Sequence, residues 1–237
     1  MQASPTVVLI HGLFGFRKLL WLEYFRQARL LYEQMGMRVI VVKLPWAGSI
    51  DRRARALAAQ LRDEPGPLHL VAHSMGGLDA RLWITHLGGG AQVVSLTTLA
   101  TPHRGSPVAD HVCASYSPFR LFAGVHALTT TAMRQFNAAT PDHIDVIYRS
   151  YAAVRPVEQL PWFMRRYARL IEQAEGENDS QVSRLSASWG TLVAVLSADH
   201  FELVSLNLWL NPFKRRQPFD PLPLYREIGE RIMQQQV

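Results

Sequence analysis

Short runs of β-branched and other apolar residues alternate with longer amphipathic segments along this chain of 237 residues. The runs cover residues 7–10, 38–42, 68–72, 93–99, 144–148 and 191–196. They contain little polar alternation, which is typical of strands that are covered on both faces, as in a parallel sheet. Because the runs alternate with helical patterns, they predict an α/β fold with a mainly parallel central sheet and right-handed crossover connections.

The segments between the runs are expected to form the helices that flank the sheet. These helices are predicted over residues 19–35, 51–61, 75–87 and 223–236. Gly36 supplies a stop after the first helix, and Ser49 supplies an N-cap before the second. Two irregular stretches, approximately 107–140 and 156–176, are expected to form a small cap on a single domain that covers residues 1–237. The alternative is that both stretches are ordinary helices whose apolar faces lie on the sheet.

Composition and charge exclude several other classes of protein. Apolar residues make up 48% of the chain and charged residues 19%, which argues against disorder. The 25 basic residues are 22 arginines and 3 lysines, dispersed along the chain, so the net charge of +6 does not predict a nucleic-acid partner. The single cysteine, Cys113, excludes an internal disulfide and a cysteine-based zinc cluster.

Neither a signal peptide nor a membrane span is expected. Residues 1–5 contain no basic residue, and the run at 6–10 is too short for a signal core. No uninterrupted apolar stretch reaches the length of about 18 residues that a transmembrane helix needs. The chain is therefore expected to be soluble and cytoplasmic, with secretion left open and the oligomeric state undetermined.

The predicted strand at 68–72 leads directly into His73-Ser74-Met75-Gly76-Gly77, which opens a helix. A serine on such a strand-to-helix turn is a nucleophile elbow, in which the hydroxyl projects out of the sheet. Residues two positions before and after the serine must be small, because bulk there collides with the adjacent strand or helix. Gly76 meets this need, and Ala72 adds only a methyl group. The alternative, a surface serine in a glycine-rich loop, does not explain the strand and helix on either side.

An oxyanion hole is predicted from the loop after the first strand. The loop reads His11-Gly12-Leu13-Phe14-Gly15, and its glycines allow the backbone amide of Leu13 to point inward. Together with the amide of Met75 it would bind the negative oxygen of a tetrahedral intermediate, where one donor typically contributes about 2.7–4 kcal/mol. His11 stands too early in the chain to be the general base and is expected to brace the loop.

The acid and the base are expected after the serine, in the chain order of this type of site. His200 follows the last predicted strand and would deprotonate Ser74, while Asp179 in a polar turn would orient the imidazole. Asp199 is a poor alternative, because neighbouring side chains in an extended turn diverge, and Asp145 is a second choice. Four histidines precede Asp179 and have the wrong order for the base, so they are expected to be structural or cap residues: His103, which is expected near the site mouth, His111, His126 and His143.

Several of these segments together resemble bacterial triacylglycerol lipases of the α/β-hydrolase superfamily. They read VLIHGLFG at 8–15, HSMGG at 73–77, ATPHRGS at 100–106, NDSQVS at 178–183 and DHFE at 199–202. The matches are collinear between residues 8 and 202. The resemblance implies an α/β-hydrolase fold with a mobile cap over an acyl-binding cleft. It also implies a catalytic triad of Ser74, Asp179 and His200, with oxyanion roles for Leu13 and Met75.

The resemblance further implies a structural calcium ion, which secreted members of the family hold with two aspartates. One of them lies two residues past the catalytic histidine, where this chain has Glu202. No clear second aspartate stands between Tyr151 and Gly176. We therefore expect no metal and no cofactor. Glu202 is expected to be a solvated side chain or a charge at a helix terminus.

The predicted function is hydrolysis of acylglycerols or related lipid esters through an acyl-enzyme intermediate. An apolar slot for the acyl chain is expected from five aromatic residues: Phe14, Phe119, Phe122, Trp162 and Phe163. The positive net charge would at most aid the approach to an anionic lipid interface. Hydrolysis of small soluble esters or thioesters on the same scaffold is the alternative, favoured by the short chain. A catalytically silent binding protein of the same fold is a further alternative, which the complete triad argues against.

Overall fold

The computed structural model describes residues 4–15, 18–19, 22–206 and 218–235 of the chain. Six parallel strands form one sheet in the order β4-β1-β5-β6-β7-β8. The strands are β1 (Thr6–Ile10), β4 (Arg38–Val41), β5 (Leu68–His73), β6 (Val93–Leu99), β7 (Ile147–Ala153) and β8 (Thr191–Leu196). The predicted parallel α/β fold is therefore confirmed, and each predicted strand corresponds to one strand of the sheet.

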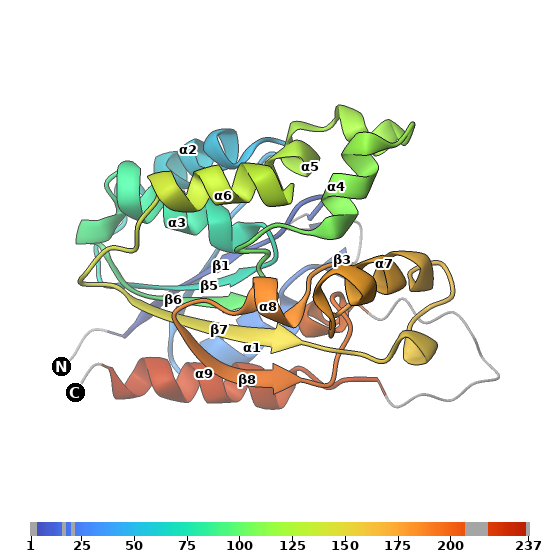
Figure 1. The fold of residues 1–237 in the computed structure, drawn as a ribbon. Helices are drawn as coiled ribbons and strands as arrows, with labels where there is room; N and C mark the ends of the chain where they lie inside the picture. The colour runs from blue at the N-terminus through green and yellow to red at the C-terminus, as the bar shows by residue number, and fades with distance from the viewer. Residues whose placement is uncertain (1–3, 16–17, 20–21, 207–217, 236–237) are drawn as a thin grey trace.

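Helices cover both faces of this sheet (Figure 1). On one face lie α2 (Ile50–Leu61), α3 (Gly76–His86) and α6 (Thr130–Ala139), and on the other lie α1 (Arg26–Gln34) and α9 (Leu222–Gln234). Near the carboxyl ends of the strands lie α4 (Pro107–Ala114), α5 (Ala123–Ala127) and α7 (Arg165–Glu175). The short elements are α8 (Arg184–Ala187) and four 3-10 turns: η1 (Gly89–Ala91), η2 (Pro118–Leu121), η3 (Val157–Gln159) and η4 (Glu202–Val204).

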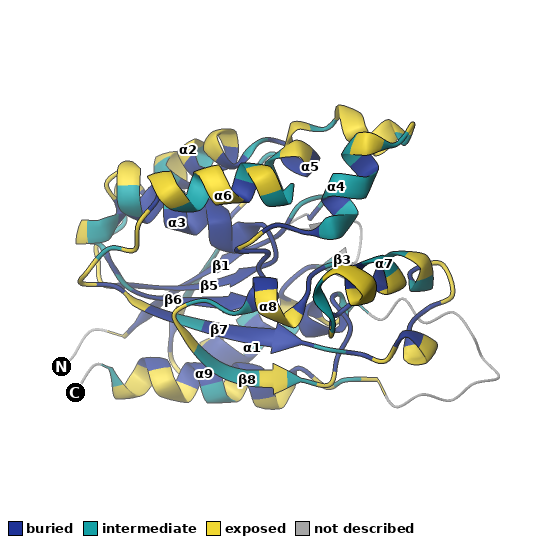
Figure 2. Ribbon diagram, in the orientation of Figure 1, coloured by how far each residue is buried: buried dark blue, intermediate teal, exposed yellow. Residues whose placement is uncertain are grey.

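Alternate residues of β1 point into two separate apolar cores. Val7 and Leu9 pack with residues of α1 and α9, whereas Val8 and Ile10 pack with residues of α2 and α3. All four side chains are fully buried. A strand that is covered on both faces has no reason to alternate apolar with polar residues, which explains the continuous runs in the sequence. Figure 2 shows the helices with their buried sides toward the sheet and their exposed sides outward.

Two elements begin later than the sequence predicts. The first helix was expected from residue 19, but β2 (Lys18–Leu19) and β3 (Leu22–Glu23) pair as a small antiparallel ribbon there, and α1 begins only at Arg26. β7 begins at Ile147 because the amides of Asp145 and Val146 bond to the ring and the carbonyl of His143 instead of the sheet. The end predicted for the last helix, residue 236, lies outside the described residues.

The stretch 107–140, predicted as part of the cap, divides between two places. Its last helix, α6, packs on the flanking layer: Met133 joins Leu78 and Ile50 in one apolar cluster, and Asn137 accepts a hydrogen bond from Arg81 of α3 at 2.8 Å. The remainder of the stretch, including α4, η2 and α5, lies near the carboxyl ends of the strands (Figure 1). In the part of the chain that is described, no helix combines the length and apolar character needed to cross a bilayer.

Candidate active site

Ser74 occupies the turn between β5 and α3, at the carboxyl end of a central strand. Its φ of +53° lies in the left-handed region, which costs a non-glycine residue about 1–3 kcal/mol and recurs at active sites. A Cβ on Gly76 would lie 2.6 Å from the carbonyl oxygen of Ile10, and a Cβ on Gly12 would lie 2.8 Å from the Cβ of Ser74. The two glycines therefore allow the turn to pack directly against β1 and the loop that follows it. Ala72 is buried in the core, so its methyl group is accommodated.

His200 and Asp179 lie side by side after β8 and α7, respectively. The imidazole Nδ1 lies 2.7 Å from Asp179 Oδ2, and both side chains are almost completely buried. Asp179 Oδ1 accepts hydrogen bonds from the amides of Gln181 at 2.9 Å and Val182 at 2.7 Å. Backbone donors of this kind stabilise an ionised carboxylate, which leaves Oδ2 to orient the imidazole.

His73, for which no role was predicted, holds the backbone of His200. Its Nε2 lies 3.0 Å from the carbonyl oxygen of His200, and its Nδ1 lies 2.7 Å from the hydroxyl of Tyr24. A carbonyl can only accept, so Nε2 carries the proton and Nδ1 accepts from the tyrosine. Burial lowers the pKa of His73 well below its usual value, which agrees with this neutral tautomer. The residue next to the serine thus fixes the loop that bears His200.

The loop after β1 is held by hydrogen bonds on both sides of Leu13. The Nδ1 of His11 donates to the carbonyl of Gly12 at 2.9 Å, and its Nε2 accepts from the amide of Leu44 at 3.1 Å. The amide of Phe14 donates to the carbonyl of Trp46 at 2.9 Å. Within the described residues the amides of Leu13 and Met75 make no hydrogen bond, so both are available to a ligand. Their part in an oxyanion hole stays a prediction.

A buried arginine, Arg53, ties this loop to the helices behind it. Its Nη2 donates to the carbonyl of His11 at 2.7 Å and its Nη1 to that of Pro45 at 2.9 Å. Its Nε donates to Asp79 Oδ2 at 2.8 Å, and both side chains of this ion pair are completely buried. Burial raises the pKa of the Asp79 carboxyl to about 7, against the lowering effect of the guanidinium. In the sequence Arg53 is one of three basic residues at 52–55, and nothing local distinguishes it from its exposed neighbours.

A second buried arginine, Arg155, binds Glu202, which stands where the lipases that this chain resembles have a calcium-binding aspartate. Glu202 Oε2 accepts from Arg155 Nη2 at 2.8 Å and from the amide of Asp199 at 2.9 Å. Glu202 Oε1 accepts from the amide of Phe219 at 3.1 Å. Glu202 is 2% exposed and is the first residue of η4, so the expectation of a solvated side chain is wrong and the alternative expectation, a charge at a helix terminus, is confirmed.

These surroundings do not fit a calcium ion. A cation at Glu202 would compete with the guanidinium of Arg155, which carries a positive charge that repels it. Among the described residues there is no group of three or more histidine, cysteine, aspartate or glutamate side chains that could hold a metal.

One cavity of about 470 Å³ brings several predicted residues together. Ser74, His200, Leu13, Phe14 and Phe119 all line it, and most of the other lining residues are apolar: Pro102, Val108, Ala109, Val112, Val125, Leu128, Val182, Phe201 and Leu206. Its few further polar groups include Tyr24, Ser106, Tyr167 and Gln181.

The other predicted aromatic residues lie outside this lining. Phe122 packs behind it, with its ring 5.4 Å from that of Phe14 between centroids. Trp162 and Phe163 contact each other on the surface after η3 and do not reach the cavity, because Trp162 is 78% exposed and Phe163 is 39% exposed. Spacing alone did not reveal that residues 161–164 form a turn with their aromatic rings outward.

The alternative acids and the remaining histidines do not contact the Ser74 cavity directly. Asp145 is exposed and precedes β7, at the opposite end of the sheet from Ser74. Asp199 Oδ1 accepts from the amides of residues 201 and 202 and so braces the turn. His103 is buried and stacked on Trp189, with ring centroids 5.2 Å apart, rather than at the site mouth. His111, His126 and His143 lie in the outer helices and turns. Of these three, His111 has its ring against that of Tyr167, which lines the cavity.

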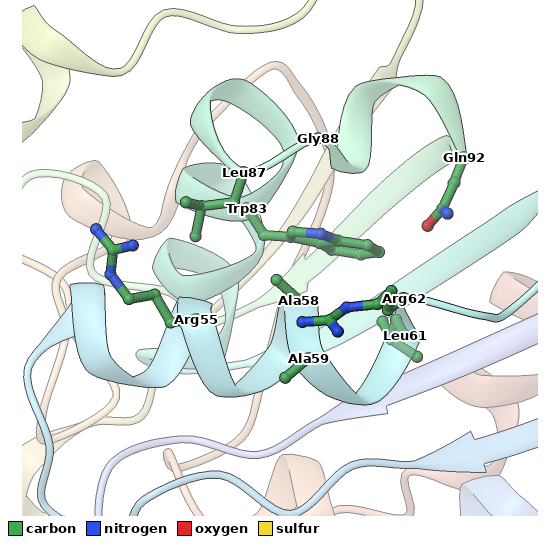
Figure 3. Close-up of a pocket in the computed structure, with 9 residues that line it drawn as sticks. All are labelled: Arg55, Ala58, Ala59, Leu61, Arg62, Trp83, Leu87, Gly88 and Gln92. Carbon is green, nitrogen blue, oxygen red and sulfur yellow. The ribbon is translucent and has the colours of Figure 1, made fainter.

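A second hollow, of about 440 Å³, lies between α2 and α3 (Figure 3). Arg55, Arg62, Trp83 and Gln92 are the large side chains around it, together with alanine and leucine residues. Its lining, as far as the chain is described, contains no serine, histidine or carboxylate, so it offers neither a nucleophile nor a base. The chemistry therefore belongs to the cavity at Ser74.

A parallel sheet flanked by helices, with a serine on a strained turn after the central strand, defines the chain as a protein of the α/β-hydrolase class. Residues 7–228 match the alpha/beta hydrolase family, and the chain belongs to that family.

Sequence relatives include triacylglycerol lipase 2 of Saccharomyces cerevisiae, which is 33% identical over 216 residues that make up 83% of this chain and 65% of the yeast protein. A triacylglycerol lipase of Pseudomonas fragi is 30% identical over 142 residues, or 58% of this chain and 48% of that protein. The chain thus spans less than two thirds of the length of the curated relatives it matches.

Solved structures with the same fold include a lipase of Bacillus licheniformis, with a TM-score of 0.75 and 23% identity over 96% of this chain and 92% of that one. A lipase of Staphylococcus hyicus has a TM-score of 0.78 and 16% identity, over 98% of this chain and 96% of that one. At these identities the two structures establish the likeness of the fold.

Proposed function

We propose that the chain is a serine carboxylester hydrolase that cleaves acylglycerols or related lipid esters. The observation that carries the proposal is one apolar cavity whose wall contains both the strained Ser74 and His200, the latter bonded at 2.7 Å to Asp179. The triacylglycerol lipases among the sequence relatives support the same reaction.

In the proposed reaction, Ser74 Oγ attacks the ester carbonyl carbon while its proton passes to Nε2 of His200. The imidazolium that forms is stabilised through its Nδ1–H by Asp179. The amides of Leu13 and Met75 bind the oxyanion of the tetrahedral intermediate. The C–O bond to the alcohol then breaks as His200 returns the proton to the leaving oxygen, and a water molecule cleaves the acyl-enzyme by the same steps in reverse.

The apolar cavity favours an acyl chain as the group that is bound. Phe14 and Phe119 would contact the chain directly, with Phe122 supporting Phe14 from behind. We propose that α4, η2, α5 and α7, which contribute lining residues or pack beside them, act as the cap.

Hydrolysis of small soluble esters is the second candidate. Rates on monomeric short esters against emulsified long-chain glycerides separate the two, since a rise at the emulsion supports the lipid substrate.

The direct test is hydrolysis of a p-nitrophenyl ester by the wild type and by Ser74→Ala. We expect the variant to lose at least about 10⁴-fold in kcat, because the nucleophile of such a site cannot be replaced by the remaining groups. The wild type should also be labelled by a fluorophosphonate probe and the variant should not. Equal rates for the two proteins would refute the assignment.

A further inference from the structure

The outer face of α7 carries an unusual concentration of positive charge next to exposed aromatic rings. Arg165, Arg166 and Arg169 surround a shallow hollow together with Trp162, and we call these four residues the α7 surface. Ala168 and Ile171 on the opposite side of the helix are buried, so the arginines face outward. Trp162 and the neighbouring Phe163 were expected to contact substrate inside the cavity, and their position on the surface calls for a different explanation.

The arginines of the α7 surface lack acidic partners within the described chain. Among the residues that the structure describes, none of the three has a carboxylate as an ion-pair partner, and no carboxylate lines the hollow. Arg165 is fixed by hydrogen bonds from its guanidinium to the backbone carbonyls of Glu158 and Leu160, at 2.9 and 3.0 Å. Arg166 and Arg169 are exposed and make no hydrogen bond among the described residues.

The position of these charges on the helix is also unfavourable without a ligand. Arg165 and Arg166 are the first two residues of α7, whose first turn contains no acidic residue. The N-terminus of a helix carries a partial positive charge, so two arginines there repel both the helix dipole and each other. A negatively charged group outside the protein would relieve this repulsion, and the free amides of the first turn add further donors.

The aromatic rings beside the arginines indicate a surface rather than a small molecule as the partner. Trp162 is 78% exposed, and its ring meets that of Phe163 at 5.8 Å between centroids. Tryptophan with arginine is the combination that enters the boundary between headgroups and acyl chains in bilayers, where the ring is partly buried and the guanidinium binds phosphate. The hollow formed by the described residues is open to solvent, so it does not enclose a soluble ligand.

The α7 surface is connected to the reactive cavity through the same helix. Tyr167, between Arg166 and Ala168, lines the cavity that contains Ser74, and its ring also faces His111 of α4. A lipid layer that contacts the outer side of α7 would therefore lie beside the wall of the cavity. An ester leaving that layer would have a short path to the nucleophile.

We propose that the α7 surface docks the protein on a lipid layer of net negative charge, with the arginines on headgroup phosphates and Trp162 in the interface. The docking proposal depends on the proposed function in one respect only, namely that the lipid layer supplies the ester substrate. Charge complementarity decides the occupant: among the described residues none of the three guanidinium groups has an acidic partner, and Arg166 and Arg169 make no hydrogen bond, which favours an anionic layer over a neutral one.

The test measures vesicle binding with the Ser74→Ala protein, so that hydrolysis cannot alter the lipid. Sedimentation is compared for vesicles of phosphatidylcholine alone and vesicles with phosphatidylglycerol added. The double variant Arg166→Gln/Arg169→Gln removes two charges from the α7 surface. The matched control Arg62→Gln/Arg134→Gln removes two charges from exposed sites at the end of α2 and on α6. Melting temperatures establish that all variants are folded.

We expect the α7 double variant to bind anionic vesicles at least about tenfold more weakly, since each arginine near an anionic surface contributes on the order of a factor of five. The control should change by less than about twofold, and added salt should reduce the difference. Equal loss in both double variants would assign the binding to net charge alone and overturn the proposal. So would equal binding of the starting protein to neutral vesicles, or its displacement by millimolar inorganic phosphate.

The result of the vesicle-binding test does not depend on whether the protein hydrolyses esters. If vesicle binding depends on Arg166 and Arg169 while the wild type fails to hydrolyse any ester, the docking surface stands and the proposed reaction is wrong. If esters are cleaved and both double variants bind like the starting protein, the docking surface alone is wrong.

Discussion

Two buried arginines anchor the two sides of the candidate site, and they do so in different ways. Arg53 donates directly to two backbone carbonyls of the nucleophile side and to Asp79. Arg155 acts on the histidine side through Glu202, whose carboxylate also accepts hydrogen bonds from two backbone amides. Each pair contains a buried atom that makes no hydrogen bond to any described residue, Asp79 Oδ1 in the first and Arg155 Nε in the second.

The same residue type thus fixes two loops by opposite means. On the nucleophile side the backbone supplies acceptors, so the arginine bonds to it without an intermediary. On the histidine side the backbone supplies donors, so a carboxylate must stand between backbone and arginine. The first anchor therefore holds three groups with one side chain, and its loss should be felt more strongly than the loss of the second.

The largest expected effect is that of Arg53→Met. The substitution leaves the buried Asp79 carboxyl group without its ion-pair partner and the carbonyls of His11 and Pro45 without their donor. Breaking a fully buried ion pair from one side typically costs about 3–5 kcal/mol of unfolding free energy. Urea unfolding measures this loss, and Arg53→Met/Asp79→Leu should recover part of it. A loss below about 1 kcal/mol would show that Arg53 is not an anchor.

A pH titration tests the same loop through His11. Both ring nitrogens of His11 are bonded, and Nε2 accepts from the amide of Leu44, so the ring must be neutral. Burial lowers its pKa from 6.5 to about 4, with a further lowering by Arg53. Between these values the unfolded chain binds a proton that the folded chain does not. The contribution of neutral His11 to the free energy of unfolding is therefore fully present above pH 6.5 and is lost as the pH falls toward 4.

The variant His11→Gln isolates that contribution, because glutamine does not titrate and the other ionisable groups are common to both proteins. The stability advantage of the wild type over the variant should shrink by about 3 kcal/mol between pH 7 and pH 4. Unfolding in urea at several pH values measures it. An advantage that stays constant with pH would mean that His11 is protonated in the folded protein or titrates normally.

On the histidine side, Arg155→Met should cost less than the loss of Arg53. Hydrogen bonds to charged groups contribute about 1.5–3 kcal/mol, and Glu202 keeps its two amide donors in the variant. We also expect a lower kcat on a soluble ester with little change in KM, since the loop that bears His200 loosens. Arg184→Met, which breaks an exposed ion pair with Glu177, is the matched control and should cost well under 1 kcal/mol. Similar losses for Arg155→Met and Arg184→Met would deny Arg155 a positioning role.

The sheet could be predicted because its signals are local. Val7 to Ile10 are buried whichever face they point to, so the apolar run predicts a strand without knowledge of its neighbours. The residues proposed for the reaction could be named for the same reason, since a serine elbow and a histidine after the last strand are recognised by their place along the chain, and their roles stay predictions. The start of β7 was missed because it depends on how His143 binds two amides, which no propensity expresses.

The anchors could not be predicted, because burial distinguishes them and burial is a property of the whole fold. Arg53 is completely buried, whereas Arg52 and Arg55 beside it are exposed. Arg155 and Glu202 are 47 residues apart and meet only when β7 and the turn after β8 are in place. The aromatic residues Trp162 and Phe163 were assigned to the cavity because their chemistry suits it, while the turn that carries them points outward.

The smallest expected effect is that of removing divalent cations from the wild type. Arg155 already neutralises Glu202, so a chelator should change neither the melting temperature nor the ester hydrolysis rate. The variant Arg155→Asp should behave differently, because it places a second carboxylate opposite Glu202 in a buried site. It should be less stable than the wild type, and added calcium should stabilise it in proportion to the logarithm of the calcium concentration. A chelator that lowers the melting temperature of the wild type would contradict the assignment of Arg155 as the cation on this side. In that case an arginine would hold the nucleophile side of the site and a divalent cation would hold the histidine side.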